Sequence, residues 1–200
     1  VANAKTTTVS TTLAGLADSA TIQKVVSEAF GLRPIPRTLN AHVFVNAIKN
    51  GQAAYIDAGT VKVVATPKAP KIETEYYLTG NINSWNNNDN TYAVKNSGAD
   101  VYTDPVFNIT LTAAQVAGQS KVEFKLTPIS KIGTEDWSEC IAAAKEDGKL
   151  VGNNAGGNIS FDVVPGAKVY KLSFNLLDQT WTCTPLSFDD YLYMAGDANG

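Results

Sequence analysis

Apolar and polar residues alternate in short segments along the second part of the chain, from Glu75 onwards. Alternation with a period of two predicts β-strands that bury one face, and polar loops separate the segments without a strand–helix–strand rhythm. This pattern favours an antiparallel β-sandwich, and with it an all-β fold class. Strands are expected at residues 76–79, 106–111, 121–126, 158–163, 169–175 and 180–184.

One segment of this part has helical spacing instead. Thr134 can cap a helix whose apolar residues recur at i, i+3, i+4 and i+7, and Gly148 can end it. The sequence therefore predicts a short helical insertion between two strands. Its apolar stripe consists of Trp137, Cys140, Ile141 and Ala144.

The first part of the chain begins with a predicted strand and a predicted helix. Residues 6–13 are rich in Thr and Val, which favour strands, and the pattern breaks at Gly15. Asp18 or Ser19 can then cap a helix that ends at Gly31. The apolar positions of that helix are Ile22, Val25, Val26, Ala29 and Phe30.

Period-two patterning returns after the helix, in residues 39–45. Asn50-Gly51 is typical of a hairpin turn, and a last strand is expected at residues 60–65. Residues 66–71 read Thr-Pro-Lys-Ala-Pro-Lys, a stiff polar linker. The first part is thus a small β-rich module with one helix, and the pattern leaves open whether it is complete.

The end of the chain repeats a segment from its middle. Residues 77–85 read Tyr-Leu-Thr-Gly-Asn-Ile-Asn-Ser-Trp, and residues 193–200 read Tyr-Met-Ala-Gly-Asp-Ala-Asn-Gly. The two copies are one domain length apart, which predicts tandem β modules and a polypeptide that continues past Gly200. The expected divisions are residues 1–70, 71–187 and 188–200, the last holding the first strand of a new repeat.

Composition is that of a globular chain with an ordinary core, at 44% hydrophobic and 18% charged residues. The formal net charge is only −3 and the basic residues are scattered, so the chain lacks the basic patch that drives nucleic-acid binding. We therefore expect no nucleic-acid partner. Cys140 and Cys183 permit one disulfide or two free thiols, and the sequence does not decide between them.

Catalytic chemistry has little support. His42 is the only histidine and falls on the polar face of an expected strand, without a nucleophile motif nearby. Glu135 and Asp136 could flank a glycosidic bond together with Glu139 or Asp162, but acidic residues in the first turn of a helix are explained more simply by the helix dipole. The sequence predicts no enzyme, no cofactor and no metal site.

Sugar binding fits the remaining residues better. A pyranose packs its C–H face on an aromatic ring, while its hydroxyls bond to amide or cationic groups. Trp85 stands in a loop among amides, where either a binding platform or a core-capping role is open. Trp137 is more ambiguous, because its place in a helical stripe points to burial. Trp181 lies in an alternating strand, which favours packing in the core or on a sheet face. The polar candidates are Lys125, Asn153 and Asn154.

Several motifs occur in the order in which a known family has them. They are residues 76–85, Glu-Phe-Lys-Leu at 123–126, Asp136-Trp137, Gly-Gly-Asn-Ile at 156–159 and a closing strand at 170–183. Over residues 75–185, with a restart at Tyr191, the chain resembles the SusE/SusF family of outer-membrane starch-utilisation lipoproteins of Bacteroidetes. Residues 34–66 look like the later part of the immunoglobulin- or fibronectin-like module of that family.

The resemblance implies a non-catalytic protein at the cell surface, anchored to the outer membrane by a lipid on a segment outside this chain. It implies an α-glucan as ligand, namely starch or maltooligosaccharides. An outer-membrane transporter and other surface glycan-binding proteins are the implied partners. By motif, Trp85 and Trp137 match the aromatic platform and Lys125 matches a basic residue that bonds sugar hydroxyls.

The chain departs from the family pattern in a long Asn-rich loop after Trp85 and in the Ala-rich segment that Trp137 opens. The alternative interpretation is a structural or protein-interaction surface module without sugar binding, in which the tryptophans belong to the core. A glycoside hydrolase ranks last, because no acid and base pair stands out.

Overall fold

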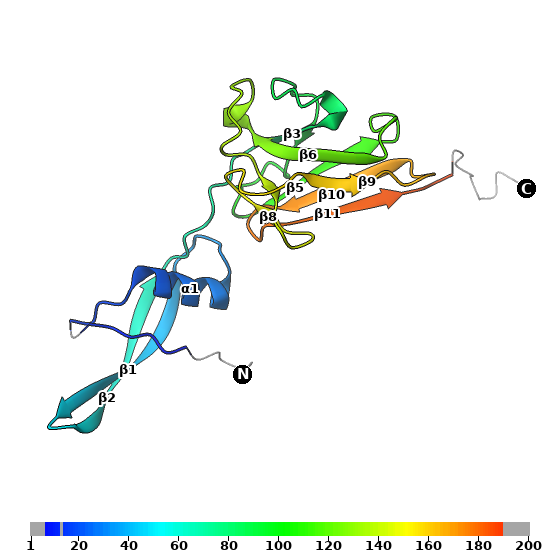
Figure 1. Ribbon diagram of the computed structural model, residues 1–200. Helices are drawn as coiled ribbons and strands as arrows, with labels where there is room; N and C mark the ends of the chain where they lie inside the picture. Colours follow the sequence, from blue (N-terminus) through cyan, green and yellow to red (C-terminus); the bar gives the residue numbers. More distant parts are fainter. Residues whose placement is uncertain (1–6, 13, 190–200) are drawn as a thin grey trace, which may run out of the picture. The chain divides into compact units, whose positions relative to one another are not determined.

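The computed structural model describes residues 7–12 and 14–189, and the chain divides into two compact units, Val1–Pro70 and Lys71–Gly200 (Figure 1). The expected first strand of a further repeat, around Tyr191 to Ala195, lies outside the described residues. Among those residues, no helix has the length and apolarity needed to cross a membrane.

Unit 1 contains the predicted helix, α1 (Ser19–Phe30). Asp18 is its N-cap, and its carboxylate accepts a hydrogen bond from the backbone N–H of Thr21 at 2.8 Å. Gly31 ends the helix with a φ of 76°, a left-handed conformation that glycine adopts without a side-chain clash. Val26 is buried on the inner side. Start, end and capping residue agree with the sequence prediction.

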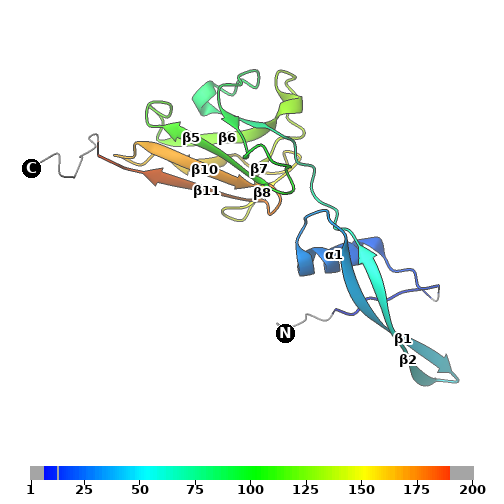
Figure 2. The same ribbon diagram turned by 180° about the vertical axis from the view of Figure 1, so that it is seen from behind.

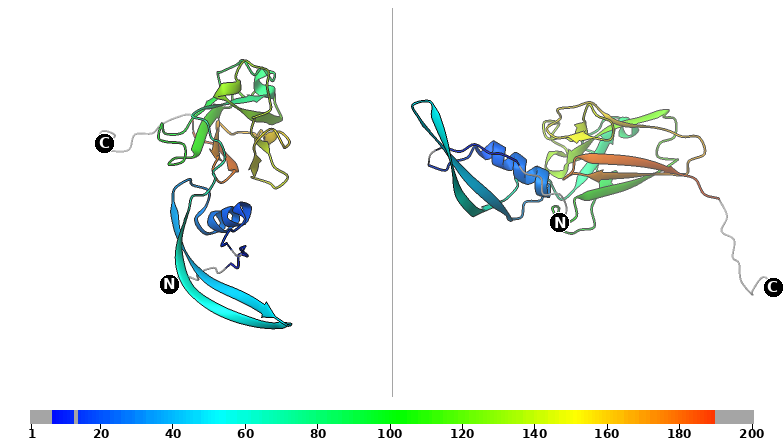
Figure 3. Two further views of the ribbon diagram at one scale, coloured as in Figure 1. Left: turned by 90° about the vertical axis from the view of Figure 1, so that its left-hand side faces the viewer. Right: turned by 90° about the horizontal axis from the view of Figure 1, so that it is seen from below.

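A long antiparallel hairpin forms the rest of unit 1: β1 (Arg37–Lys49) and β2 (Gln52–Ala65) (Figure 3). Asn50 and Gly51 make its two-residue turn with φ values of 50° and 78°. Both values lie in the left-handed region that this hairpin turn requires. The second strand is much longer than predicted, because the whole length of β1 provides it with backbone partners.

The strand expected at residues 6–13 is wrong for the part that is described. Within residues 7–12, Thr11 makes a single bridge to Ala17. The N–H of Thr12 donates to the carbonyl of Leu16, and its own carbonyl accepts from the N–H of Gly15. This tight turn uses the backbone groups that a strand would offer to a neighbour.

The described residues of unit 1 make one two-stranded sheet and one helix. An immunoglobulin- or fibronectin-like fold needs a second packed sheet. The assignment of residues 1–70 to that class therefore stays a prediction.

Unit 2 is a sandwich of two antiparallel sheets (Figures 1 and 2). One sheet has the strand order β4-β3-β6-β9 and the other β11-β10-β5, the latter seen together in Figure 2. The bounds are β3 (Tyr76–Gly80), β4 (Ala93–Val94), β5 (Val106–Thr112), β6 (Lys121–Pro128), β9 (Ile159–Asp162), β10 (Val169–Asn175) and β11 (Thr180–Leu186). All six predicted strands are present, and the all-β class is confirmed.

Aromatic side chains join the two sheets. The ring centroids of Tyr76 and Phe107 lie 5.4 Å apart, and those of Phe124 and Phe174 lie 6.0 Å apart, both edge to face. Edge-to-face contact places the positive rim of one ring on the negative face of the other. The core between the sheets is therefore made of residues that the two-residue period placed on one face.

The other face of the β3–β6 sheet is also covered. Thr79 and Thr127 are fully buried there, and their hydroxyl oxygens lie 2.9 Å apart in a hydrogen bond. The Sγ of Cys140 lies 3.6 Å from the hydroxyl of Thr127. Lys125 is the register partner of Thr79 and lies two residues before Thr127 on β6, so its side chain belongs to the same face. A polar outer layer thus separates the sheet from the loops that carry the candidate site.

The helix predicted from Thr134 to Gly148 is wrong. The segment contains turns and a small hairpin of β7 (Ala142–Ala143) with β8 (Leu150–Val151). Cys140 and Ala142 are buried while Ile141 is half-buried, which is alternation rather than a helical stripe. The backbone of Ile141 bonds to that of Leu126 in β6, a pairing that a helix would forbid.

Candidate functional site

Trp85 stands on a tight turn after β3. A short 3-10 helix, η1 (Asn81–Asn83), follows the strand, and both Ser84 and Trp85 have left-handed φ values of 54° and 58°. The N–H of Trp85 donates to the carbonyl of Gly80 at 2.8 Å. The turn holds the indole at the surface end of the strand, half-buried and therefore partly open to solvent.

Trp137 lies in an irregular segment after β6. Another 3-10 helix, η2 (Ile129–Lys131), precedes this segment, and β7 follows it. The carbonyl of Trp137 accepts a hydrogen bond from the N–H of Cys140 at 3.1 Å, so a turn closes behind the indole. Its side chain is half-buried as well.

The two tryptophan loops meet. The N–H of Gly133 donates to the carbonyl of Asn87 at 2.9 Å, which ties the loop after Trp85 to the loop before Trp137. The indole ring centroids are 6.3 Å apart, with 55° between the ring planes. Two partly exposed rings from distant parts of the sequence therefore form one inclined aromatic pair.

Lys125 and Asn154 form the polar part of the site. The Nζ of Lys125 donates to the Oδ1 of Asn154 and lies 3.5 Å from the carbonyl oxygen of Gly156. The N–H of Asn154 donates to the carbonyl of Cys140 at 2.7 Å. Because Cys140 also bonds back to Trp137, backbone and side-chain hydrogen bonds connect the lysine to the aromatic pair.

Asn153 and Asn154 make the turn that presents these groups. Their φ values are 54° and 53°, a left-handed pair that asparagine tolerates better than most residues. Asn153 is exposed, while Asn154 is half-buried against Lys125. The five candidate residues thus lie on loops and one strand that hydrogen bonds or ring contacts connect, with Asn153 joined only through its neighbour.

The other aromatic and histidine candidates from the sequence make contacts outside this site. Trp181 is half-buried on β11 and packs on Phe174 and Phe124, at centroid distances of 6.2 and 6.3 Å, as expected for a residue that packs on the sheet. His42 bonds through Nε2 to the carboxylate of Asp57 at 2.7 Å in the unit 1 hairpin. In the described part of the chain, no group of three or more His, Cys, Asp or Glu residues is placed to hold a metal ion.

Among the acidic candidates, Asp136 and Glu139 pair with the same lysine. Lys131 holds Asp136 at 2.5 Å and Glu139 at 3.2 Å. The hydrogen bond from Lys131 keeps the pKa of Asp136 well below its ordinary value, and bonds from Lys71 and Lys131 lower the pKa of Glu139. Neither group can act as a general acid near neutral pH, because both stay ionised.

Two contributors to the site were missed at the sequence level. Asn87 lies in an Asn-rich run that suggests a solvated turn, yet its side chain is buried and its Nδ2 has no hydrogen-bond partner among the described residues. Lys131 carries no motif at all. The backbone carbonyl of Asn87 bonds to Gly133 across the two loops, and Lys131 bonds to Asp136 and Glu139 within its own irregular segment. Periodicity has no signal for contacts between loops or within an irregular segment.

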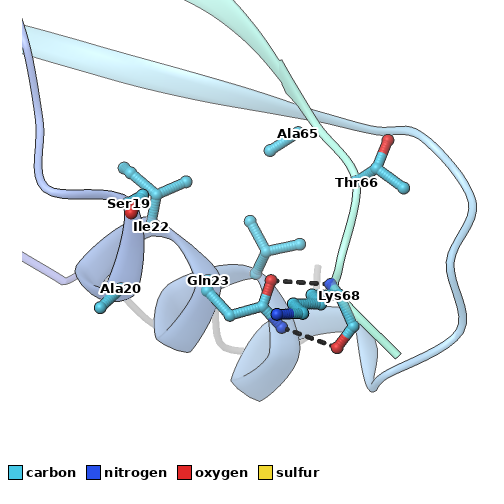
Figure 4. Close-up of a pocket in the computed structure, with 8 residues that line it drawn as sticks. Ser19, Ala20, Ile22, Gln23, Ala65, Thr66 and Lys68 are labelled. Atoms are coloured by element: carbon cyan, nitrogen blue, oxygen red, sulfur yellow. Dashed lines mark hydrogen bonds between the residues drawn. The ribbon is translucent and has the colours of Figure 1, made fainter. Parts of the chain in front are cut away.

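A separate hollow of about 490 Å³ lies in unit 1 (Figure 4). The Gln23 side chain crosses it and bonds to both the N–H and the carbonyl of Lys68, at 2.7 and 3.2 Å. These bonds fasten the chain after β2 to α1. Its lining contains no aromatic ring and consists of Ser19, Ala20, Ile22, Gln23, Val26, Ala65, Thr66 and Lys68.

Comparison with protein families gives two matches that together cover most of the chain. Residues 71–185 match the model described as "SusF, first starch specific CBM". Residues 1–67 match the model described as "Outer membrane protein SusF, N-terminal domain". Searches of curated proteins and of solved structures returned no match.

Proposed function

Because this chain belongs to the SusF family of outer-membrane, starch-binding proteins, we propose that its second unit binds starch or maltooligosaccharides at the Trp85–Trp137 pair without catalysing a reaction. The observation that carries the proposal is the inclined pair of partly exposed indoles. Each indole offers an apolar face on which the C–H face of one glucose ring can stack.

The angle between the indoles favours one class of glucan. An α-1,4-linked glucan is curved, so the faces of successive glucose rings are inclined to one another, whereas a β-1,4-linked glucan is a flat ribbon. Ring planes 55° apart suit the curved chain, because two neighbouring sugars can then each lie flat on one indole. We therefore infer an α-glucan as ligand.

Lys125 and Asn154 supply the hydrogen bonds in this proposal. A sugar hydroxyl is both donor and acceptor, so it can accept from the lysine Nζ and donate to the amide oxygen that the lysine now contacts. Asn153, exposed on the same turn, offers a second amide. Stacking then provides most of the affinity and the polar groups fix the orientation.

The test is a calorimetric titration of the full chain with maltoheptaose, with cellohexaose as the matched β-linked control. We expect saturable binding of maltoheptaose and none of cellohexaose at the same concentrations. Equal affinity for the two sugars would contradict the α-glucan assignment. Absence of binding to both would contradict the proposed function and favour a structural or protein-interaction module.

Replacement of Lys125 by methionine should weaken maltoheptaose binding about tenfold, because a hydrogen bond to a charged group contributes roughly 1.5 kcal/mol or more. The methionine keeps most of the apolar stem of the side chain. Lys171→Met is the matched control, since Lys171 is exposed on β10 in the opposite sheet. An affinity unchanged in Lys125→Met would remove this lysine from the site.

The proposal includes the cell surface as the place of binding. The outer-membrane description belongs to the family, and we propose a lipid anchor on a segment outside this chain. Weak single sites retain a polymer best when several are linked, because linkage raises the effective concentration at each site. A surface transporter and other glycan-binding proteins are the proposed recipients of the bound glucan.

A further inference from the structure

Charged side chains hold the segment that carries Trp137. Between η2 and β7 the backbone forms no helix or strand, so hydrogen-bond ladders do not fix the indole. Asp136 and Glu139 lie on either side of Trp137 in sequence, and Lys131 bonds to both carboxylates, at 2.5 and 3.2 Å. The lysine side chain is only 20% exposed, so these two contacts are more enclosed than an ordinary surface salt bridge.

Further ion pairs and hydrogen bonds connect these contacts into a closed circuit, which we call the Lys131 ring. Glu139 also binds Lys71 at 2.7 Å, and Lys71 lies 3.2 Å from a carboxylate oxygen of Glu73. The Glu73 carboxylate, 14% exposed, accepts from the hydroxyl of Ser130 at 2.6 Å and from its N–H at 3.0 Å. Ser130 precedes Lys131 in η2, so the path returns to its start.

The carboxylate of Asp136 makes a second contact, with the backbone that follows Trp137. Its Oδ1 accepts from the N–H of Ser138 at 2.9 Å, which turns the backbone directly after Trp137. The neighbouring Glu135 has a left-handed φ of 57°, a conformation that non-glycine residues adopt only when their surroundings hold them. The direction in which the indole leaves the backbone thus depends on the bonds to Asp136.

We propose that Lys131 is a positioning residue that sets the inclination of Trp137 against Trp85, and thereby determines how strongly affinity rises with glucan length. The inference rests on the proposed function. A single glucose ring needs only one indole, so its affinity does not depend on the angle between the two. A longer glucan gains from the second indole only when both rings present their faces along its curve.

The closed set of ion pairs and hydrogen bonds around Lys131 is charged at neutral pH. Hydrogen bonding to Asp136 raises the pKa of Lys131, and hydrogen bonding to Lys71 and Lys131 lowers the pKa of Glu139. Each shift favours the ionised form of the group. The lysine therefore acts as a cation between two anions at neutral pH.

Lys131→Met in the full chain tests this proposal, with Lys95→Met as matched control. Lys95 makes an ion pair of 2.8 Å with Glu75 that involves neither tryptophan. We expect Lys131→Met to weaken maltoheptaose binding about fivefold, less than truncation of an indole, because the second stacking contact is misaligned and not removed. Binding of methyl α-glucopyranoside should stay unchanged within about twofold. Lys131→Arg, which keeps the charge, should restore most of the length dependence.

A second readout does not need a ligand. Two close indoles give paired circular-dichroism bands of opposite sign, and the size of this couplet depends on the angle between the rings. The couplet should shrink in Lys131→Met and stay at the wild-type size in Lys95→Met. A lysine that only stabilises the fold would leave the couplet of the folded variant unchanged.

The outcomes separate the two proposals. A wild-type couplet and wild-type length dependence in Lys131→Met would overturn the positioning role while leaving starch binding intact. A wild-type protein that binds neither sugar would overturn the proposed function, and the couplet would still decide the role of Lys131. If Lys131→Met does not fold, Glu139→Gln removes the negative charge that pairs with both Lys131 and Lys71, and it is judged by the same two readouts.

Discussion

Replacing Trp137 by alanine is expected to lower the affinity of the chain for maltoheptaose by about 30-fold or more. Buried tryptophans at the centre of binding sites contribute about 2 kcal/mol or more when truncated, which corresponds to this factor. Trp85→Ala should have a similar effect, because each indole provides one of two stacking faces. Isothermal titration calorimetry of both variants measures the loss.

The double variant Trp85→Ala/Trp137→Ala should lose little more affinity than either single variant. In each single variant the one remaining indole already no longer holds a curved glucan. Trp181→Phe is the matched control, because that residue packs on Phe174 and phenylalanine preserves a ring there. An unchanged affinity in both Trp85→Ala and Trp137→Ala would mean that the sugar, if bound, lies elsewhere.

Gly156→Ala is expected to destabilise unit 2 by about 3 kcal/mol, at the upper end of overpacking effects. A Cβ at Gly156 would lie 1.9 Å from the carbonyl oxygen of Ala143 and 2.8 Å from a methyl group of Val151. The first of these atoms belongs to the backbone of β7, so the small hairpin would have to move. That hairpin packs beside the turn of Asn153 and Asn154, and the site should loosen with it.

Gly157→Ala provides the control at the next position. A Cβ there meets nothing within 4 Å, so the free energy of unfolding should change by less than about 0.5 kcal/mol. Urea unfolding, followed by tryptophan fluorescence, measures both variants. Equal stabilities of the two would contradict the close approach of Gly156 to β7.

The sequence was most informative where burial follows a simple period. Residues 169–175 were predicted as a strand and form β10 with the same limits, because Tyr170, Leu172 and Phe174 all face the core. The helix α1 was predicted with its cap and its end, because Asp18 and Gly31 are local signals. In these elements local preference and tertiary packing agree.

The segment from Thr134 to Gly148 shows where the sequence misleads. Trp137, Cys140, Ile141 and Ala144 have helical spacing, but Cys140 packs on the outer layer of β6 and Ala142 joins β7. These partners are distant in sequence, and the pairing of Ile141 with Leu126 outweighs a weak helix preference. Tertiary contacts therefore determine the conformation of this segment.

The candidate site was predictable residue by residue but not as an arrangement. Loop position and composition made Trp85 and Trp137 candidates for either a binding platform or a core role, and the alternation in β6 pointed Lys125 away from the core. The meeting of the two indoles depends on the bond between Gly133 and Asn87 and on the charges around Lys131. Periodicity predicts which face of a helix or strand is buried. It does not predict which loops contact each other.

The most direct test of the account is a nuclear magnetic resonance titration that follows the indole N–H signals of the three tryptophans as maltoheptaose is added. The account predicts that the signals of Trp85 and Trp137 move together and saturate, while that of Trp181 stays in place. Movement of the Trp181 signal alone, or no movement of the Trp85 and Trp137 signals while sugar binds, would contradict it.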